Sequence, residues 1–152
     1  MAEQRAAVDR VAVVRALTHF LPRGDWVGAF DDTAEPAQLR TYLEGVAVPD
    51  LEVEGMVAGQ AGLVAPAPGV DGLVEFWRDW LEPWETFTVE TREIREGPKA
   101  VLIDAVQKGR LAGSRATVET PSAAVFFFRG DRLARIEFHL DQQEAREAAG
   151  IT

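Results

Sequence analysis

The pattern of apolar and polar residues predicts three long strands in the last third of the chain, over 101–108, 115–128 and 132–140. Between the last two, Arg129-Gly130-Asp131 is typical of a tight turn, because glycine tolerates the positive φ that hairpin turns need. Alternating residues over 86–95 and, more weakly, over 51–57 indicate two further strands. A sheet of this kind must bury one face, so the segments upstream are expected to cover it.

The helical segments are predicted from apolar residues at three- and four-residue spacing. Such a pattern runs over 3–21, 34–45 and 71–82, with Asp71 as the expected N-cap of the last of these. Asp25 is expected to cap a short helix over 26–30. The stretch 59–70 is rich in glycine, alanine and proline and is interpreted as a loop, either a plain connector or a cover for a cavity. A short helix is expected at the C-terminus.

This order of elements predicts one α+β domain spanning 1–152. Helices, an opening strand, another helix and then four strands in series point to a curved antiparallel sheet wrapped by the N-terminal helices into a cone. At 152 residues the chain is long enough for one sizeable core. A concave sheet beneath helices is expected to leave a pocket at the wide end of the cone.

Charge and composition restrict the partners. The formal net charge is −9 and no basic stripe stands out, so nucleic acid and anionic membranes are poor partners for this chain. No apolar run approaches the roughly 20 residues that span a bilayer. There is no cysteine, which removes disulfides and thiolate chemistry. The first residues lack the layout of a signal peptide, so the cytoplasm is the expected location.

Several local strings resemble the SnoaL-like polyketide cyclase family, part of the nuclear-transport-factor-2-like or cystatin-like fold group. They lie at 23–26, 72–80, 107–110, 113–114, 125–131, 140–141, 144–145 and 148–150. The resemblance covers nearly the whole chain apart from 31–60. It implies the cone-shaped α+β fold and no particular reaction, because this fold hosts isomerases, cyclases, hydrolases, dehydratases and non-catalytic modules.

Two positions test whether the chemistry of that fold group is carried over. Ketosteroid isomerases of this fold place a phenol eight residues before the aspartate that corresponds to Asp25, and Leu17 stands there. The polyketide cyclases place an acidic residue three before the aspartate that corresponds to Asp141, and Phe138 stands there. Neither enzyme's chemistry is transferred by the resemblance.

The candidate catalytic pair is Glu137 and His139, which share one face of the last strand. Facing into an apolar cone, a carboxylate beside an imidazole would form a proton-transfer pair. The alternative is that the apolar face with Ile136, Phe138 and Leu140 fills the core, and that the polar face meets solvent or a second subunit.

The expected pocket lining combines aromatic and polar side chains. Core packing alone would also explain the aromatic residues, and outward-facing strand positions would explain the polar ones. The aromatic candidates are Trp77, Trp80, Trp84, Tyr42 and Phe76, and the polar candidates are Gln107, Glu119 and Asp104.

No cofactor or metal site is indicated. Two histidines without cysteine give no recognisable ligand spacing, and no glycine-rich phosphate loop or serine elbow occurs. Two functions remain open: a protein that binds a small hydrophobic molecule, with or without cofactor-free acid–base catalysis, and a non-catalytic dimeric module. The second would pair outer positions such as Val125 and Phe127 across a homodimer.

Overall fold

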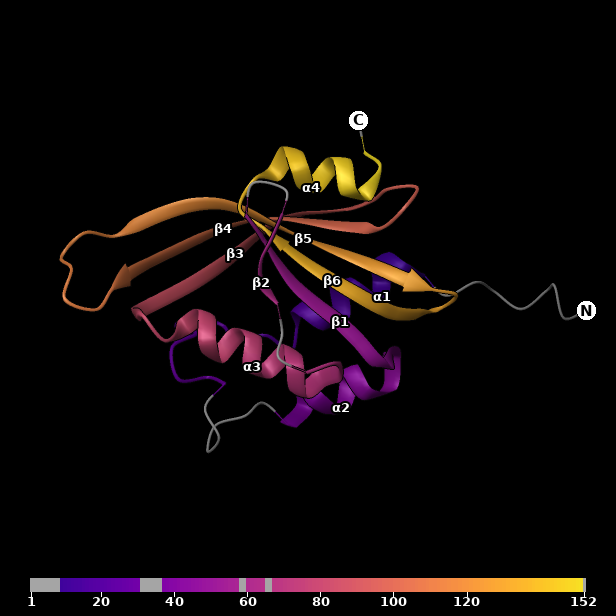
Figure 1. The fold of residues 1–152 in the computed structure, drawn as a ribbon, viewed down its shortest axis with the longest axis horizontal. Helices are drawn as coiled ribbons and strands as arrows, with labels where there is room; N and C mark the ends of the chain where they lie inside the picture. The colour runs from indigo at the N-terminus through magenta and orange to yellow at the C-terminus, as the bar shows by residue number, and fades with distance from the viewer. Residues whose placement is uncertain (1–8, 31–36, 58–59, 65–66, 152) are drawn as a thin grey trace, which may run out of the picture.

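The computed structural model describes residues 9–30, 37–57, 60–64 and 67–151. Four helices and six strands occur in this part of the chain (Figure 1). Their order is α1 Arg10–Thr18, α2 Ala37–Val46, β1 Ala47–Val57, β2 Gln60–Val64, α3 Gly69–Leu81, β3 Trp84–Glu96, β4 Val101–Leu111, β5 Val118–Arg129, β6 Arg132–His139 and α4 Gln142–Ala149.

The strands form one curved sheet in the order β2-β1-β6-β5-β4-β3. Strands β3 to β6 follow one another as antiparallel neighbours, as expected. The hairpin between β5 and β6 turns at Gly130, whose φ of +65° favours glycine. Strand β1 pairs with β6 in parallel, which the sequence pattern did not predict, so the sheet is mixed at this one junction.

Helices lie on both sides of the sheet. In Figure 1, α2 and α3 lie below the sheet and α1 is drawn behind it, whereas α4 lies above it. Asp141 caps α4 by accepting hydrogen bonds from the backbone N–H groups of Gln143 and Glu144, and Gly150 ends it at a φ of +78°. The chain therefore folds its last turns back over the outer face of its own sheet.

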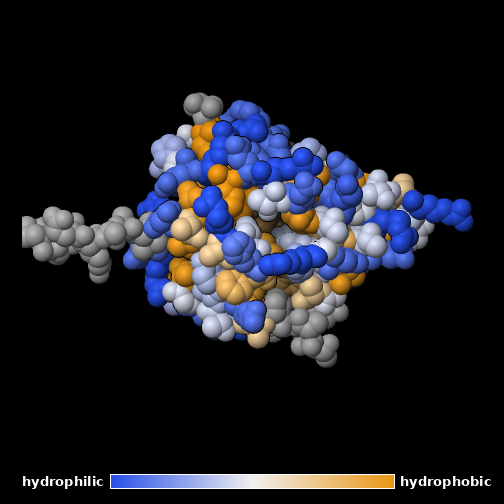
Figure 2. Space-filling view, turned by 180° about the vertical axis from the view of Figure 1, so that it is seen from behind, coloured by the Kyte–Doolittle hydropathy of each residue, from blue (hydrophilic) through white to orange (hydrophobic). Residues whose placement is uncertain are grey.

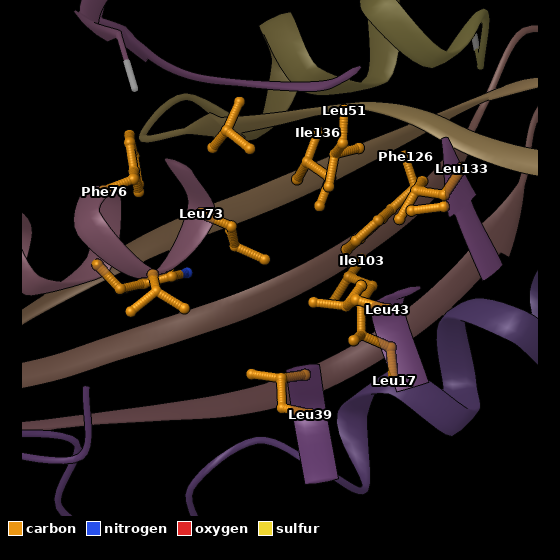
Figure 3. Packing of buried hydrophobic residues seen from close by; sticks show 14 of the residues in the cluster. Leu17, Leu39, Leu43, Leu51, Leu73, Phe76, Ile103, Phe126, Leu133 and Ile136 are labelled. Carbon is orange, nitrogen blue, oxygen red and sulfur yellow. The ribbon is translucent and has the colours of Figure 1, made fainter. Parts of the chain in front are cut away.

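Two hydrophobic cores result from this layering. The larger core fills the space between the concave face and α1 to α3. Figure 3 shows Leu39, Leu43 and Leu73 from the helices among Ile103, Phe126 and Ile136 from the strands. The smaller core lies beneath α4, where Ala145 and Ala149 pack on Leu102, Ala123 and Val125.

Three local predictions were wrong. Residues 27–30 form a turn, because the Asp25 carboxylate accepts from the backbone N–H of Val27 and also of Phe87 in β3, which ties this segment to the sheet. Residues 60–64, expected to be loop, form β2. Pro68, not Asp71, is the N-cap of α3, and the Asp71 carboxylate accepts a hydrogen bond from Arg40 at 2.7 Å.

Other predicted segments lie partly outside the described residues. These are 3–8 of the first predicted helix, 34–36 of the next one, and 59 and 65–66 of the predicted loop. Within the described part, helix α1 ends at Thr18 and not at Leu21.

Candidate functional site

A cavity of about 70 Å³ lies between the concave face of the sheet and the helices. Most of its wall is aliphatic or aromatic, and Thr91, Gln107 and Ser122 supply hydroxyl and amide groups. No Asp, Glu, His, Lys, Arg or Tyr occurs among the described residues that line it. The lining consists of Leu17, Leu21, Trp26, Phe30, Leu39, Leu73, Trp77, Val89, Thr91, Ile103, Ala105, Gln107, Ser122, Ala123, Ala124, Phe126, Ile136 and Phe138.

Strand β4 shows how the sequence forms this wall. Its residues alternate between the two faces, so Ile103, Ala105 and Gln107 face the cavity together. Ala105 pairs with Thr91 on one side and with Ser122 on the other. Because Ala105 has only a methyl group, it leaves space at the centre of this row.

Aromatic rings form the side of the cavity near α3. Trp77 is buried, and its ring centroid lies 4.7 Å from that of Trp26 and 5.0 Å from that of Phe138. Phe30 stacks on Trp77 at 6.2 Å. These contacts hold the rings in fixed orientations and make this wall rigid and apolar.

Of the predicted aromatic residues, Trp77 lies in the cavity wall and the other four do not. Phe76 stacks on Phe138 with centroids 5.0 Å apart, one layer behind the wall. Trp80 and Trp84 pack against Phe87, toward the start of β3. The Tyr42 hydroxyl donates to the Val13 carbonyl oxygen between α2 and α1, and burial raises the pKa of this phenol.

Of the predicted polar residues, Gln107 lines the cavity, whereas Asp104 and Glu119 lie on the outer face of the sheet. Successive residues of a strand point to opposite faces of the sheet. Because Ala105 of β4 and Ser122 of β5 face the cavity, Asp104 and Glu119 face away from it. Asp104 is buried with one carboxylate oxygen 3.7 Å from an Arg146 guanidinium nitrogen of α4. Glu119 is exposed and lies 3.4 Å from Lys108.

Glu137 and His139 also lie on the outer face, because their neighbours Ile136 and Phe138 face the cavity. The sheet therefore separates the candidate catalytic pair from the cavity. The pair does form: His139 Nε2 lies 2.9 Å from Glu137 Oε1. An ionised carboxylate can only accept, so we place the proton of this hydrogen bond on Nε2. His139 Nδ1 is buried and has no partner among the described residues.

Arg135 joins this pair to strand β1. Its guanidinium donates to Glu137 Oε2 at 2.9 Å and to both carboxylate oxygens of Glu54, at 3.0 and 3.3 Å. Glu52 lies 3.7 Å away at the exposed rim. The parallel pairing of β1 with β6 brings these charges together, because it places Arg135 opposite Glu52 and Glu137 opposite Glu54. This is an electrostatic link between two strands.

The charge state of Glu137 makes this link sensitive to acid. The hydrogen bond from His139 lowers the pKa of Glu137 most, burial opposes the change, and the hydrogen bond and charge of Arg135 lower it further. Because the folded pKa lies below the unfolded value, the stabilising contribution is complete above the unfolded pKa of about 4.3 and is lost as pH falls through the folded pKa.

We therefore expect the free energy of unfolding of Glu137→Gln to fall less steeply than that of the wild type as the pH is lowered below about 4.3, the unfolded pKa of glutamate. The free energy of unfolding, measured by urea denaturation at several pH values, tests this. Glu119→Gln, a change at an exposed glutamate on the neighbouring strand, serves as the control and should leave the slope unchanged. Equal slopes for Glu137→Gln and the wild type would contradict the assignment.

Sequence reasoning missed Ser122, Thr91 and Trp26 as lining residues. Ser122 and Thr91 both pair with Ala105 on the neighbouring strands, so they face the cavity with it. The register of these strands would have identified them as lining residues, but the sequence pattern does not give the register. Trp26 lies between Asp25 and a turn, outside any helix or strand. Its position therefore depends on the hydrogen bond that ties Asp25 to β3, which the sequence pattern does not reveal.

Clusters of metal ligands and membrane-crossing helices are both absent from the described residues. Within them, no three His, Asp or Glu side chains are grouped to hold a metal ion. No helix in the same part of the chain combines the length and apolar character needed to cross a bilayer.

Comparison with known proteins gives structural neighbours only. No family model matches the sequence, and no curated protein matches it. A protein named as a SnoaL-like polyketide cyclase from Jannaschia sp. CCS1 superposes with a TM-score of 0.61 at 14% identity, covering 98% of this chain and 99% of the other.

Two further structures agree with this. An NTF2-like protein of unknown function from Burkholderia pseudomallei has a TM-score of 0.59 at 15% identity, covering 92% of this chain and 96% of its own. A protein with a ketosteroid isomerase-like fold from Catenulispora acidiphila, in complex with trimethylamine, has a TM-score of 0.51 at 15% identity, covering 90% and 93%. The chain therefore has the α+β fold shared by SnoaL-like, NTF2-like and ketosteroid isomerase-like proteins.

Proposed function

We propose that this protein binds a small, mostly apolar molecule in the cavity beneath its sheet and does not catalyse acid–base chemistry there. The observation that carries the proposal is the wall itself. It combines aromatic and aliphatic side chains with a few neutral polar groups, and no described lining residue can gain or lose a proton near neutral pH. General acid–base catalysis requires such a group within hydrogen-bonding reach of the substrate.

The residues at the two positions compared with known enzymes support binding over catalysis. Leu17 and Phe138 both line the cavity. At these positions the side chains are apolar, so they add contact surface for a ligand where the corresponding residues of the enzymes supply a phenol or a carboxylate.

The volume indicates a small ligand. At about 70 Å³ the cavity is smaller than the apolar space of about 150 Å³ that admits benzene in an engineered protein. A single ring would fit after rotation of lining side chains that are only partly buried and lie outside the aromatic wall, such as Leu21 and Val89.

The Glu137–His139 pair does not favour an enzyme acting in this cavity. A substrate bound between the helices and the concave face could not reach either side chain, because both project from the opposite face. Their hydrogen bonds to each other and to Arg135 account for them as a link between strands.

The proposal is tested by titrating toluene into the protein with isotope-labelled isoleucine methyl groups. We expect saturable shifts at Ile103 and Ile136, which line the cavity, and much smaller shifts at Ile151, which packs beneath α4. Ala105→Val should reduce the affinity because its two additional methyl groups would occupy part of the cavity. Ala148→Val adds the same two methyl groups beside the smaller core and should leave binding unchanged.

Shifts of equal size at all three isoleucines, or unchanged binding in Ala105→Val, would contradict the proposal. Native mass spectrometry of the protein as purified would reveal a ligand carried over from the cell. A retained mass that Ala105→Val loses and Ala148→Val keeps would support binding in this cavity.

The alternative of a non-catalytic homodimer stays a prediction, and it no longer rests on Val125 and Phe127. Val125 is fully buried, and Phe127 packs with it in the core that α4 covers. These residues are used within one chain, so sedimentation velocity is needed to establish whether a dimer forms.

A further inference from the structure

The neutral polar groups of the cavity occupy neighbouring positions on β3, β4 and β5. Thr91, Ala105 and Ser122 form one row across β3, β4 and β5. Gln107 lies two residues further along β4, facing the same way, in register with Val89 and Thr120. Thr91, Gln107 and Ser122 therefore surround the small Ala105 side chain, and we name these three residues the polar end of the cavity.

The side chains of the polar end form no hydrogen bond with other described residues. Of the three residues, Ser122 is the most buried, at 4% exposed. The Gln142 amide of α4 donates to the carbonyl oxygens of Ala105, at 3.3 Å, and of Ser122, at 3.1 Å. These two carbonyl groups therefore have partners, whereas the hydroxyl and amide groups of the polar end can still form hydrogen bonds with a ligand.

Another unused donor lies in the same wall. The indole Nε1–H of Trp26 is buried and has no partner among the described residues. Indole nitrogen can only donate, whereas hydroxyl and amide groups can both donate and accept. The lining therefore offers more hydrogen-bonding capacity to an oxygen atom than to a purely apolar molecule.

The chemistry of these groups also restricts the charge of the ligand. No charged side chain occurs among the described lining residues, so a bound carboxylate or ammonium group would be removed from water without a counter-charge. A hydroxyl, carbonyl or carboxamide group would exchange its hydrogen bonds with water for hydrogen bonds with the protein.

From these observations, and on the basis of the function proposed above, we infer that the natural ligand is uncharged and carries a single oxygen-containing group, alcohol or carbonyl, on an apolar body. The polar end binds that oxygen, with Ser122 as the buried contact and Gln107 and Thr91 beside it. The aromatic wall around Trp77 contacts the apolar body.

Four probes of similar size test the inference: toluene, benzyl alcohol, benzoate and benzylammonium. Isothermal titration or the fluorescence of Trp26 and Trp77 gives the four dissociation constants. We expect benzyl alcohol to bind about two- to tenfold more tightly than toluene, which is the range for one neutral hydrogen bond. Benzoate and benzylammonium should bind at least about tenfold more weakly than toluene, because both charges lack a partner.

Matched variants locate the effect. Ser122→Ala and Thr91→Val should each reduce the preference for benzyl alcohol over toluene while leaving toluene affinity within about twofold. Ser114→Ala and Thr88→Val remove hydroxyl groups that lie outside the cavity lining and should keep the preference. Gln107→Met, which keeps the size of the side chain and removes its amide, should also reduce the preference.

The outcomes distinguish this inference from the proposed function. Equal binding of toluene and benzyl alcohol, or an unchanged preference in Ser122→Ala and Gln107→Met together, would overturn the inference and leave apolar binding in place. Binding of benzoate or benzylammonium more tightly than benzyl alcohol would overturn it as well. Failure of all four probes to bind the wild type would overturn both proposals.

Discussion

Replacement of Trp77 by alanine is expected to lower the free energy of unfolding by about 3–5 kcal/mol, the range for removing a large buried aromatic side chain. Trp77 stands at the centre of the aromatic cluster and contacts rings from the turn after α1, from α3, from β3 and from β6. Removal of its indole would leave a void next to the existing cavity, and several rings would lose contacts at once.

Urea denaturation followed by circular dichroism measures the change. Val27→Ala is a suitable control, because Val27 follows Trp26 in the chain but is 36% exposed, and its replacement should cost less than about 0.5 kcal/mol. A loss below about 1.5 kcal/mol for Trp77→Ala would show that the cluster rearranges to fill the space.

Replacement of Arg135 by alanine is expected to lower the free energy of unfolding by about 2–3 kcal/mol. The change leaves Glu54 and Glu137 without their shared cation. Arg135 is only 24% exposed and Glu137 only 12%, so water can stabilise their charges only in part. Removal of one partner from a fully buried pair costs about 3–5 kcal/mol, and partial exposure places this case somewhat lower.

A combined variant separates the pairing from the packing. Arg135→Leu with Glu54→Gln and Glu137→Gln removes the cation and both anions together, and should recover most of the loss. Arg129→Ala is the surface control, because Arg129 and Asp50 are both exposed and lie 3.8 Å apart, and it should cost less than about 0.5 kcal/mol. A triple variant as unstable as Arg135→Ala would contradict the electrostatic explanation.

Much of the fold could be predicted from the sequence because its signals are local. The hairpin of β5 and β6 is specified by strand-forming residues on either side of Arg129-Gly130-Asp131, and α3 by apolar residues at helical spacing. Strand β2 could not be predicted in this way. Its sequence, Gln60 to Val64, has little of the β-branched character of a strand and depends on pairing with β1 for its conformation.

The site was less predictable because it depends on which face of each strand turns inward. The pattern of β6 left two possibilities, and the structure shows the apolar face with Ile136 and Phe138 against the cavity. The polar face is not simply exposed to solvent: His139 is 3% exposed, and Arg135 joins Glu137 to Glu54 of β1. That contact depends on a parallel pairing between distant segments, which no local pattern encodes.

The parallel pairing of β1 with β6 has a consequence for the order in which the sheet can assemble. Strands β3 to β6 are joined by hairpins, so each can add to its neighbour after closing only a short loop. Strand β1 must instead reach β6 from the other half of the chain, and contacts of such separation form late and slow the overall folding rate. We therefore expect the antiparallel strands β3 to β6 to pair first. The β1–β2 hairpin would then complete the sheet by pairing with β6, the strand that is synthesised last.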